Sequence, residues 1–108
     1  MVLYDVIISP KALLQLDKYI DYIQFTLLNE QAAESVWKDA IETSETLKTV
    51  AGSLKLCDHP KLEKLGYRSI CFLKHKYIML YRIEDGIVYV EAIYHQLQDY
   101  ENSFVKEL

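Results

Sequence analysis

The sequence predicts a two-layer α+β domain in which two helices pack on one face of an antiparallel sheet. Near the start, a run of strand-forming residues is followed at once by residues typical of a helix start. Two stretches with apolar residues at helical spacing come next, and three more runs of strand-forming residues come later. The chain has 108 residues, of which 51% are hydrophobic and only 3 are glycine. This length and composition predict a single self-folding domain over residues 1–108.

The first predicted strand covers residues 2–8, which are mostly β-branched or aromatic. Ser9 and Pro10 then have the residue types of an N-cap and a first helical turn, so a helix begins there. We expect this helix to end near Leu28 and to bury one apolar stripe in the core. The stripe consists of Leu13, Leu16, Ile20, Ile23 and Leu27.

A second helix is predicted from an N-cap at Asn29 to Gly52. Because the junction of Leu28 and Asn29 is so short, the two helices should form an antiparallel hairpin. The apolar positions of the second helix are Ala33, Val36 or Trp37, Ala40, Ser44, Leu47 and Ala51. Trp37 lies on or beside this stripe, and we interpret it as a core residue rather than a base-stacking one.

Residues 53–64 lose the helical period, and we interpret them as a loop with room for one short helical turn. The later strands are predicted at Tyr67 to Leu73, His75 to Ile83 and Ile87 to Tyr94, with a hairpin turn at residues 84–86. Residues 97–108 predict a short terminal helix. The sheet residues expected to share one core with the first helix are Ile70, Phe72, Ile78 and Leu80.

The formal net charge is −4, but the sign of the charge changes along the chain. Residues 1–52 carry −4, residues 53–82 carry +5 and residues 83–108 carry −5. The basic residues of the middle segment are Lys55, Lys61, Lys64, Arg68, Lys74, Lys76 and Arg82. We expect this segment to lie on one side of the sheet and to bind an acidic partner or a target. A solvated, salt-bridged surface is the alternative interpretation.

The sequence also predicts a cytoplasmic protein with no membrane partner. No apolar run reaches the roughly 18 residues that a membrane span requires, and the first residues do not resemble a signal peptide. Cys57 and Cys71 fit neither a disulfide framework nor a metal-binding spacing, so we expect reduced thiols, no metal and no cofactor.

Four stretches, taken in their order and spacing, resemble the RelE/ParE toxin superfamily. They are VIISPKA at residues 6–12, LGYR at 65–68, YIMLYRI at 77–83 and AIYHQLQDY at 92–100. The resemblance implies the toxin component of a type II toxin–antitoxin module, which inhibits bacterial growth and is neutralised by a cognate antitoxin. It implies one of two targets, messenger RNA on the ribosome or DNA gyrase, and it leaves a homodimer open.

For the RNA-cleaving branch, the resemblance implies metal-free attack of the ribose 2′-hydroxyl on its own phosphate. That step requires a proton acceptor, a proton donor and fixed positive charge. Arg68 is the candidate for charge at the catalytic site, and His95 and Tyr100 are the candidates for proton transfer. The residues expected to bind RNA, the target or the antitoxin are Lys64, Lys74, Lys76 and Arg82.

The chain departs from the RNA-cleaving pattern where that chemistry takes place. Ile78 stands where those relatives commonly have an arginine, and Leu97 and Gln98 stand where one or two more follow the final histidine. Enzymatic activity is therefore left open. A degenerate member that keeps only antitoxin contacts is the alternative function, with His95 as a structural residue. An unrelated small enzyme has the least support, because the sequence has no recognisable nucleophile–base pair or phosphate loop.

Overall fold

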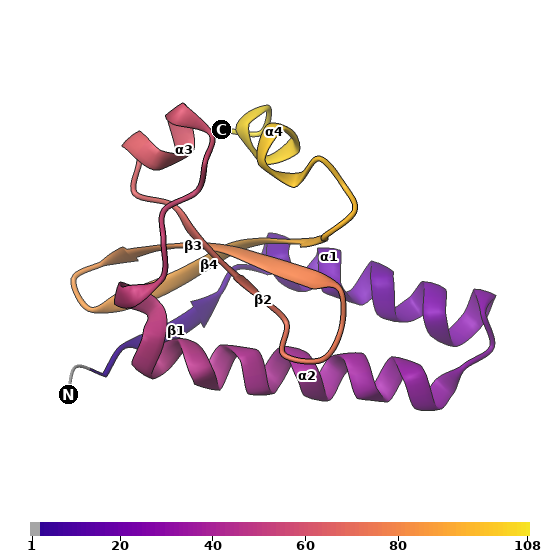
Figure 1. Cartoon of the computed structure of the whole chain (residues 1–108). Helices are drawn as coiled ribbons and strands as arrows, with labels where there is room; N and C mark the ends of the chain where they lie inside the picture. The colour runs from indigo at the N-terminus through magenta and orange to yellow at the C-terminus, as the bar shows by residue number, and fades with distance from the viewer. Residues whose placement is uncertain (1–2) are drawn as a thin grey trace.

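The computed structural model describes residues 3–108 as one four-stranded sheet with helices on both of its faces (Figure 1). Its elements are β1 (Asp5–Ile8), α1 (Pro10–Asp21), the π-helical turn η1 (Tyr22–Thr26), α2 (Glu30–Val50), the 3-10 turn η2 (Ala51–Ser53), α3 (Pro60–Lys64), β2 (Arg68–Cys71), β3 (Tyr77–Glu84), β4 (Ile87–His95) and α4 (Tyr100–Val105). The predicted α+β class and element order are confirmed. Within residues 3–108, no helix has both the length and the apolar character needed to cross a membrane.

The strand order in the sheet is β1-β4-β3-β2, so β1 and β2 form its two edges. Strands β2, β3 and β4 form the predicted antiparallel meander, whereas β1 pairs parallel with β4 from Asp5–Ile87 to Ile8–Val90. Asp85 and Gly86 have φ values of 51° and 76°, which suit the tight turn of a two-residue hairpin. The predicted β3–β4 hairpin is therefore confirmed.

Both predicted helix starts are confirmed by their caps. The Ser9 hydroxyl accepts a hydrogen bond from the Ala12 N–H at 3.1 Å, and Asn29 Oδ1 accepts one from the Ala32 N–H at 3.0 Å. Between the two helices, η1 and a left-handed Leu28 with φ of 53° reverse the chain. These local signals produce the helical hairpin that covers one face of the sheet.

The predicted stripe of the first helix is only partly correct. Leu16 is fully buried, and Ile20 and Ile23 are half-buried against the core. Leu13 is 36% exposed and Leu27 is 55% exposed. In η1 the Leu27 N–H bonds to Tyr22 O, five residues back, so the wider turn rotates Leu27 out of the α-helical stripe.

The sheet buries two cores rather than the single one that we expected. Ile70 and Phe72 pack with α1 and α2 as predicted, but Ile78 and Leu80 lie in a second cluster with Leu62 of α3 and Phe104 of α4. Successive strand residues point to opposite faces, which is why Met79 and Tyr81 face the helical hairpin instead. Helices α3 and α4 thus form a partial third layer opposite α1 and α2 (Figure 1).

Candidate functional site

Arg68 is the first residue of β2 and secures a neighbouring loop. Side chains two residues apart in a strand point to the same face of the sheet, so Arg68 lies on the same face as Ile70. This is the face that the helical hairpin covers. Its guanidinium donates a hydrogen bond to the carbonyl oxygen of Leu54. Its register partner Tyr81 donates to the carbonyl oxygen of Ala51 at 2.8 Å. These two bonds tie η2 and the following residues to the sheet, which gives Arg68 a structural contact.

His95 is the last residue of β4, and its ring meets the ring of Tyr77 edge-on at 5.2 Å. The Leu97 N–H donates to His95 Nδ1 at 3.1 Å. An accepting Nδ1 requires that the neutral ring carries its proton on Nε2. In this arrangement, neither ring nitrogen is free to take a proton from a substrate hydroxyl.

Tyr100 opens α4 and packs against the second core, which contains Phe104. Burial is the main cause that raises the pKa of Tyr100, and the neighbouring Glu101 raises it further. A catalytic tyrosine base needs the opposite effect, a cationic neighbourhood that lowers its pKa. The phenol of Tyr100 therefore stays protonated at neutral pH.

The structure does not bring Arg68, His95 and Tyr100 together. Arg68 pairs with Tyr81, which pairs with Val90, and His95 lies five residues further along β4. At about 3.3 Å per residue, this is a separation of roughly 16 Å along the strand direction alone. Tyr100 packs on the second core, opposite the face that Arg68 occupies.

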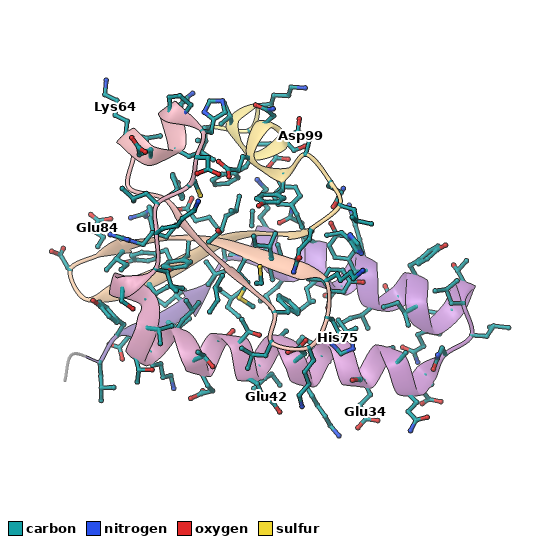
Figure 2. The ribbon with its side chains drawn as sticks, viewed as in Figure 1. Glu34, Glu42, Lys64, His75, Glu84 and Asp99 are labelled. Carbon is teal, nitrogen blue, oxygen red and sulfur yellow. The ribbon has the colours of Figure 1, made fainter. Side chains whose placement is uncertain are left out.

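The basic segment is also divided between different surfaces, so the expectation of one basic side is wrong. Lys74 Nζ lies 3.6 Å from the carboxylate of Glu42 on α2, while Lys76 is exposed in the same β2–β3 loop. Lys64 projects from α3 on the opposite face of the sheet (Figure 2). The charges are separated because successive side chains of a strand point to opposite faces of the sheet, and because α3 lies on the face opposite α2.

Arg82 belongs to the α3 and α4 face and is neutralised there. Its Nε lies 2.5 Å from Glu91 and its Nη1 2.5 Å from Glu84, while its guanidinium lies 4.5 Å from the centre of the Tyr89 ring. Hydrogen bonding to Glu84 is the first cause that raises the pKa of Arg82. This arginine has carboxylate partners within the chain and does not present a free cation to a ligand.

The structure does assemble a different polar cluster, at the point where the β2–β3 loop meets α2 (Figure 2). The Asp39 carboxylate is completely buried and accepts the backbone N–H groups of Lys74 at 3.0 Å and His75 at 2.8 Å. It also lies 2.7 Å from His75 Nδ1, and His75 Nε2 lies 3.4 Å from the hydroxyl of Ser35. Ser35, Asp39 and His75 thus form a connected chain.

The sequence did not predict this cluster, because none of its three residues belongs to a recognisable motif. Ser35 and Asp39 belong to the polar positions of a helix, and His75 follows 36 residues after Asp39. One available signal was their spacing, since residues four apart lie on the same helix face. The other was the position of Asp39 next to Ala40, which places it at the border of the apolar stripe.

The outer surface of the helical hairpin carries a groove that passes Trp37. Trp37 is 42% exposed, so its expected place in the core is wrong; Val36 and Ala40 take the buried positions beside it. Toward the hairpin tip, the groove is a depression of roughly 420 Å³ that includes Asp17, Glu30 and Glu34. A separate, mostly apolar hollow of roughly 130 Å³ lies on the β1 side of Trp37, with Ile8, Leu13 and Ile41 among its lining residues. The two hollows, which share Trp37, are together called the groove.

Comparisons with known proteins agree with this architecture. A family model described as the ParE toxin of the type II toxin–antitoxin system parDE matches residues 6–100. A solved structure described as a chromosomal ParDE TA system from P. aeruginosa aligns with a TM-score of 0.71 and 18% identity, covering 86% of this chain and 96% of that one. At this identity, the structural match shows a shared fold. Among curated protein sequences, none matches the chain.

Proposed function

The chain belongs to the ParE toxin family of type II toxin–antitoxin systems, and we propose that it inhibits growth by binding DNA gyrase rather than by cutting messenger RNA. The observation that carries this proposal is the separation of Arg68, His95 and Tyr100 on different faces and positions of the sheet. Metal-free RNA cleavage needs these groups to converge on one phosphate. A toxin that acts through binding has no such requirement.

The cost of a dispersed site is large. Removal of one preorganised donor from a transition state typically slows a reaction by about 10²- to 10³-fold. Here Arg68 donates to Leu54, and Ile78 occupies the position where an arginine is expected in RNA-cleaving relatives. These two differences support a binding mechanism over catalysis.

We further propose that the cognate antitoxin occupies the groove beside Trp37. The apolar part of this groove includes Ile8 of β1, and β1 is an edge strand with one unpaired side. An antitoxin segment that adds a strand to this edge would place apolar side chains near Leu13 and Ile41. The acidic part of the groove near Glu30 then favours basic residues further along the same segment.

A test of the target follows two readouts after the protein is induced in cells. We expect gyrase-linked DNA breaks to accumulate while ribosome-bound messages stay intact. Prompt message cleavage that disappears in the Arg68→Ala variant would contradict the gyrase proposal. A complete lack of growth inhibition by the folded protein would instead favour the alternative function, a module that retains only antitoxin contacts.

The antitoxin surface is tested by co-expression of the antitoxin with Ile41→Glu. Ile41 is 47% exposed in the groove, so the charge should weaken neutralisation without unfolding the protein. The matched control is Leu97→Glu, because Leu97 is 83% exposed and lies outside the groove. Equal neutralisation of both variants would place the antitoxin elsewhere.

A further inference from the structure

We propose that Ser35 is an activated nucleophile that accepts an acyl group from activated esters, with His75 as its general base and Asp39 as the group that orients His75. The site lies on the surface where α2 meets the β2–β3 loop. Ser35, Asp39 and His75 do not line the groove beside Trp37, although Glu34 lines both that groove and the depression at Ser35. They are also distinct from the predicted residues Arg68, His95 and Tyr100. The inference is therefore independent of the proposed toxin function.

The contact between His75 and Asp39 fixes the tautomer of the His75 ring. Its Nδ1 lies 2.7 Å from a carboxylate oxygen of Asp39, and a carboxylate only accepts, so Nδ1 carries the proton. The neutral ring then presents an unprotonated Nε2 to the Ser35 hydroxyl at 3.4 Å. A serine beside a base that is itself oriented by a carboxylate is the arrangement that activates a hydroxyl for acyl transfer.

Buried hydrogen bonds of Asp39 and Thr43 hold the β2–β3 loop, which carries His75, against α2. Asp39 is held on α2 and accepts two backbone N–H groups from Lys74 and His75 besides the ring nitrogen. Thr43, also buried, accepts the Leu73 N–H at 3.3 Å and donates to the carbonyl oxygen of Asp39 at 2.7 Å. These bonds fix the loop against the helix, so the ring of His75 is preorganised toward Ser35.

Two other serines of the helical region differ from Ser35 in the partner of their hydroxyl group. Ser44 donates to Ala40 O at 3.0 Å, and Ser53 donates to Val50 O at 2.9 Å. Those hydroxyl protons are committed to backbone carbonyls. Ser35 is exposed, and its hydroxyl contacts a histidine nitrogen instead.

The residues around Ser35 limit the range of esters with which it can react. Ser35 lines a depression of roughly 270 Å³ together with Gln31, Glu34 and Lys38. Lys38 lies 3.1 Å from Glu34, and the backbone N–H groups around Ser35 belong to α2. Without a pair of free backbone donors for the oxyanion, turnover should be slow. We therefore expect the Ser35 hydroxyl to be acylated only by esters with good leaving groups, such as nitrophenyl esters.

The proposed step is a simple acyl transfer. Ser35 Oγ forms a bond to the ester carbonyl carbon while its proton passes to His75 Nε2. The tetrahedral intermediate then collapses, the bond from carbon to the leaving oxygen breaks, and His75 returns the proton to that oxygen. The products are an ester on Ser35 and a free phenol or alcohol, and water completes hydrolysis in a second slow step.

The test treats the full chain with 4-nitrophenyl acetate and locates acetyl groups by peptide mass spectrometry over time. Within the wild type, Ser35 should be acetylated at least about tenfold faster than Ser53, because a positioned base typically contributes 10²- to 10⁴-fold. Ser53 is an exposed serine without a histidine partner and serves as the internal control.

Two variants separate the base from the fold. His75→Gln should reduce Ser35 acetylation to the Ser53 rate, whereas His95→Gln should leave it unchanged, with thermal unfolding used to show that both variants are folded. Equal acetylation of Ser35 and Ser53 in the wild type would overturn the proposal without reference to any variant. Unchanged acetylation of Ser35 in folded His75→Gln would also overturn it.

Discussion

His75 and His95 lie at the same end of the sheet, yet their rings have opposite hydrogen-bonding roles. Gln96, next to His95, donates from its backbone to Lys76 O at 2.9 Å, which joins the two segments. His75 Nδ1 donates to the buried Asp39 carboxylate, whereas His95 Nδ1 accepts from the Leu97 N–H. The fold therefore decides what each histidine can do, because it supplies the partner of one ring nitrogen and so sets the role of the other.

Among the variants that test this comparison, we expect substitution of Asp39 to cause the largest loss of stability. Asp39→Ala removes the acceptor of two backbone N–H groups and of His75, so it should lower the free energy of unfolding by about 3 to 5 kcal/mol. His95→Ala, by contrast, removes a partly exposed ring that contacts the Leu97 N–H and the edge of the Tyr77 ring, so it should cost about 1 kcal/mol or less. Urea unfolding measures both values. Similar losses for the two variants would remove the proposed difference between the regions.

Leu16 and Leu13 extend the comparison to apolar residues of one helix. Leu16 is 1% exposed, so Leu16→Ala should cost about 2 to 5 kcal/mol. Leu13 is 36% exposed at the groove, and Leu13→Ala should cost less than about 1 kcal/mol. Thermal or urea unfolding of both variants gives the two values. A Leu16 loss under about 0.5 kcal/mol would mean that α1 presents a different face to the sheet.

Thr43 and Thr46 on α2 provide a smaller test of the loop anchor. Thr43 bonds both to Asp39 O and to the Leu73 N–H, whereas Thr46 bonds only to Glu42 O within the helix. Thr43→Val should therefore destabilise the protein by about 1 to 2 kcal/mol, because it leaves the Leu73 N–H without its partner. Thr46→Val should change stability by less than about 0.5 kcal/mol. The comparison fails if Thr46→Val is the more costly change.

The two cysteines differ in the reactivity of their thiols, which is the smallest of the expected effects. Burial raises the pKa of Cys57 to about 12, whereas Cys71 is exposed on the edge strand β2. The thiolate is the reactive form, so at pH 8 a folded Cys57 stays protonated and inert. Iodoacetamide should modify Cys71 in the native protein and Cys57 only after unfolding. Rapid native alkylation of Cys57 would show that the second core is open.

Local signals in the sequence predicted much of the fold. Ser9 and Asn29 act as caps because an N-cap needs only a side chain and an N–H three residues later. The Asp85-Gly86 turn likewise depends on the conformations of adjacent residues. These features were predictable because each is determined within a few residues.

Features that depend on distant partners were not predicted. The parallel pairing of β1 with β4 joins residues 5–8 to residues 87–90, and no local pattern specifies it. The separate core around Ile78 depends on α3 and α4, which were expected only as a short turn and a short terminal helix. The Asp39–His75 pair likewise needs the β2–β3 loop to fold against α2.

The double variant His95→Ala/Tyr100→Phe shows whether Arg68, His95 and Tyr100 act as one catalytic site, which the fold predicts they do not. The variant and the wild type are induced to equal levels, with growth and the integrity of ribosome-bound messages measured together. Because these residues are separated, we expect the same growth arrest for both proteins, with messages intact. Loss of arrest in a folded double variant, together with message cleavage by the wild type alone, would contradict it.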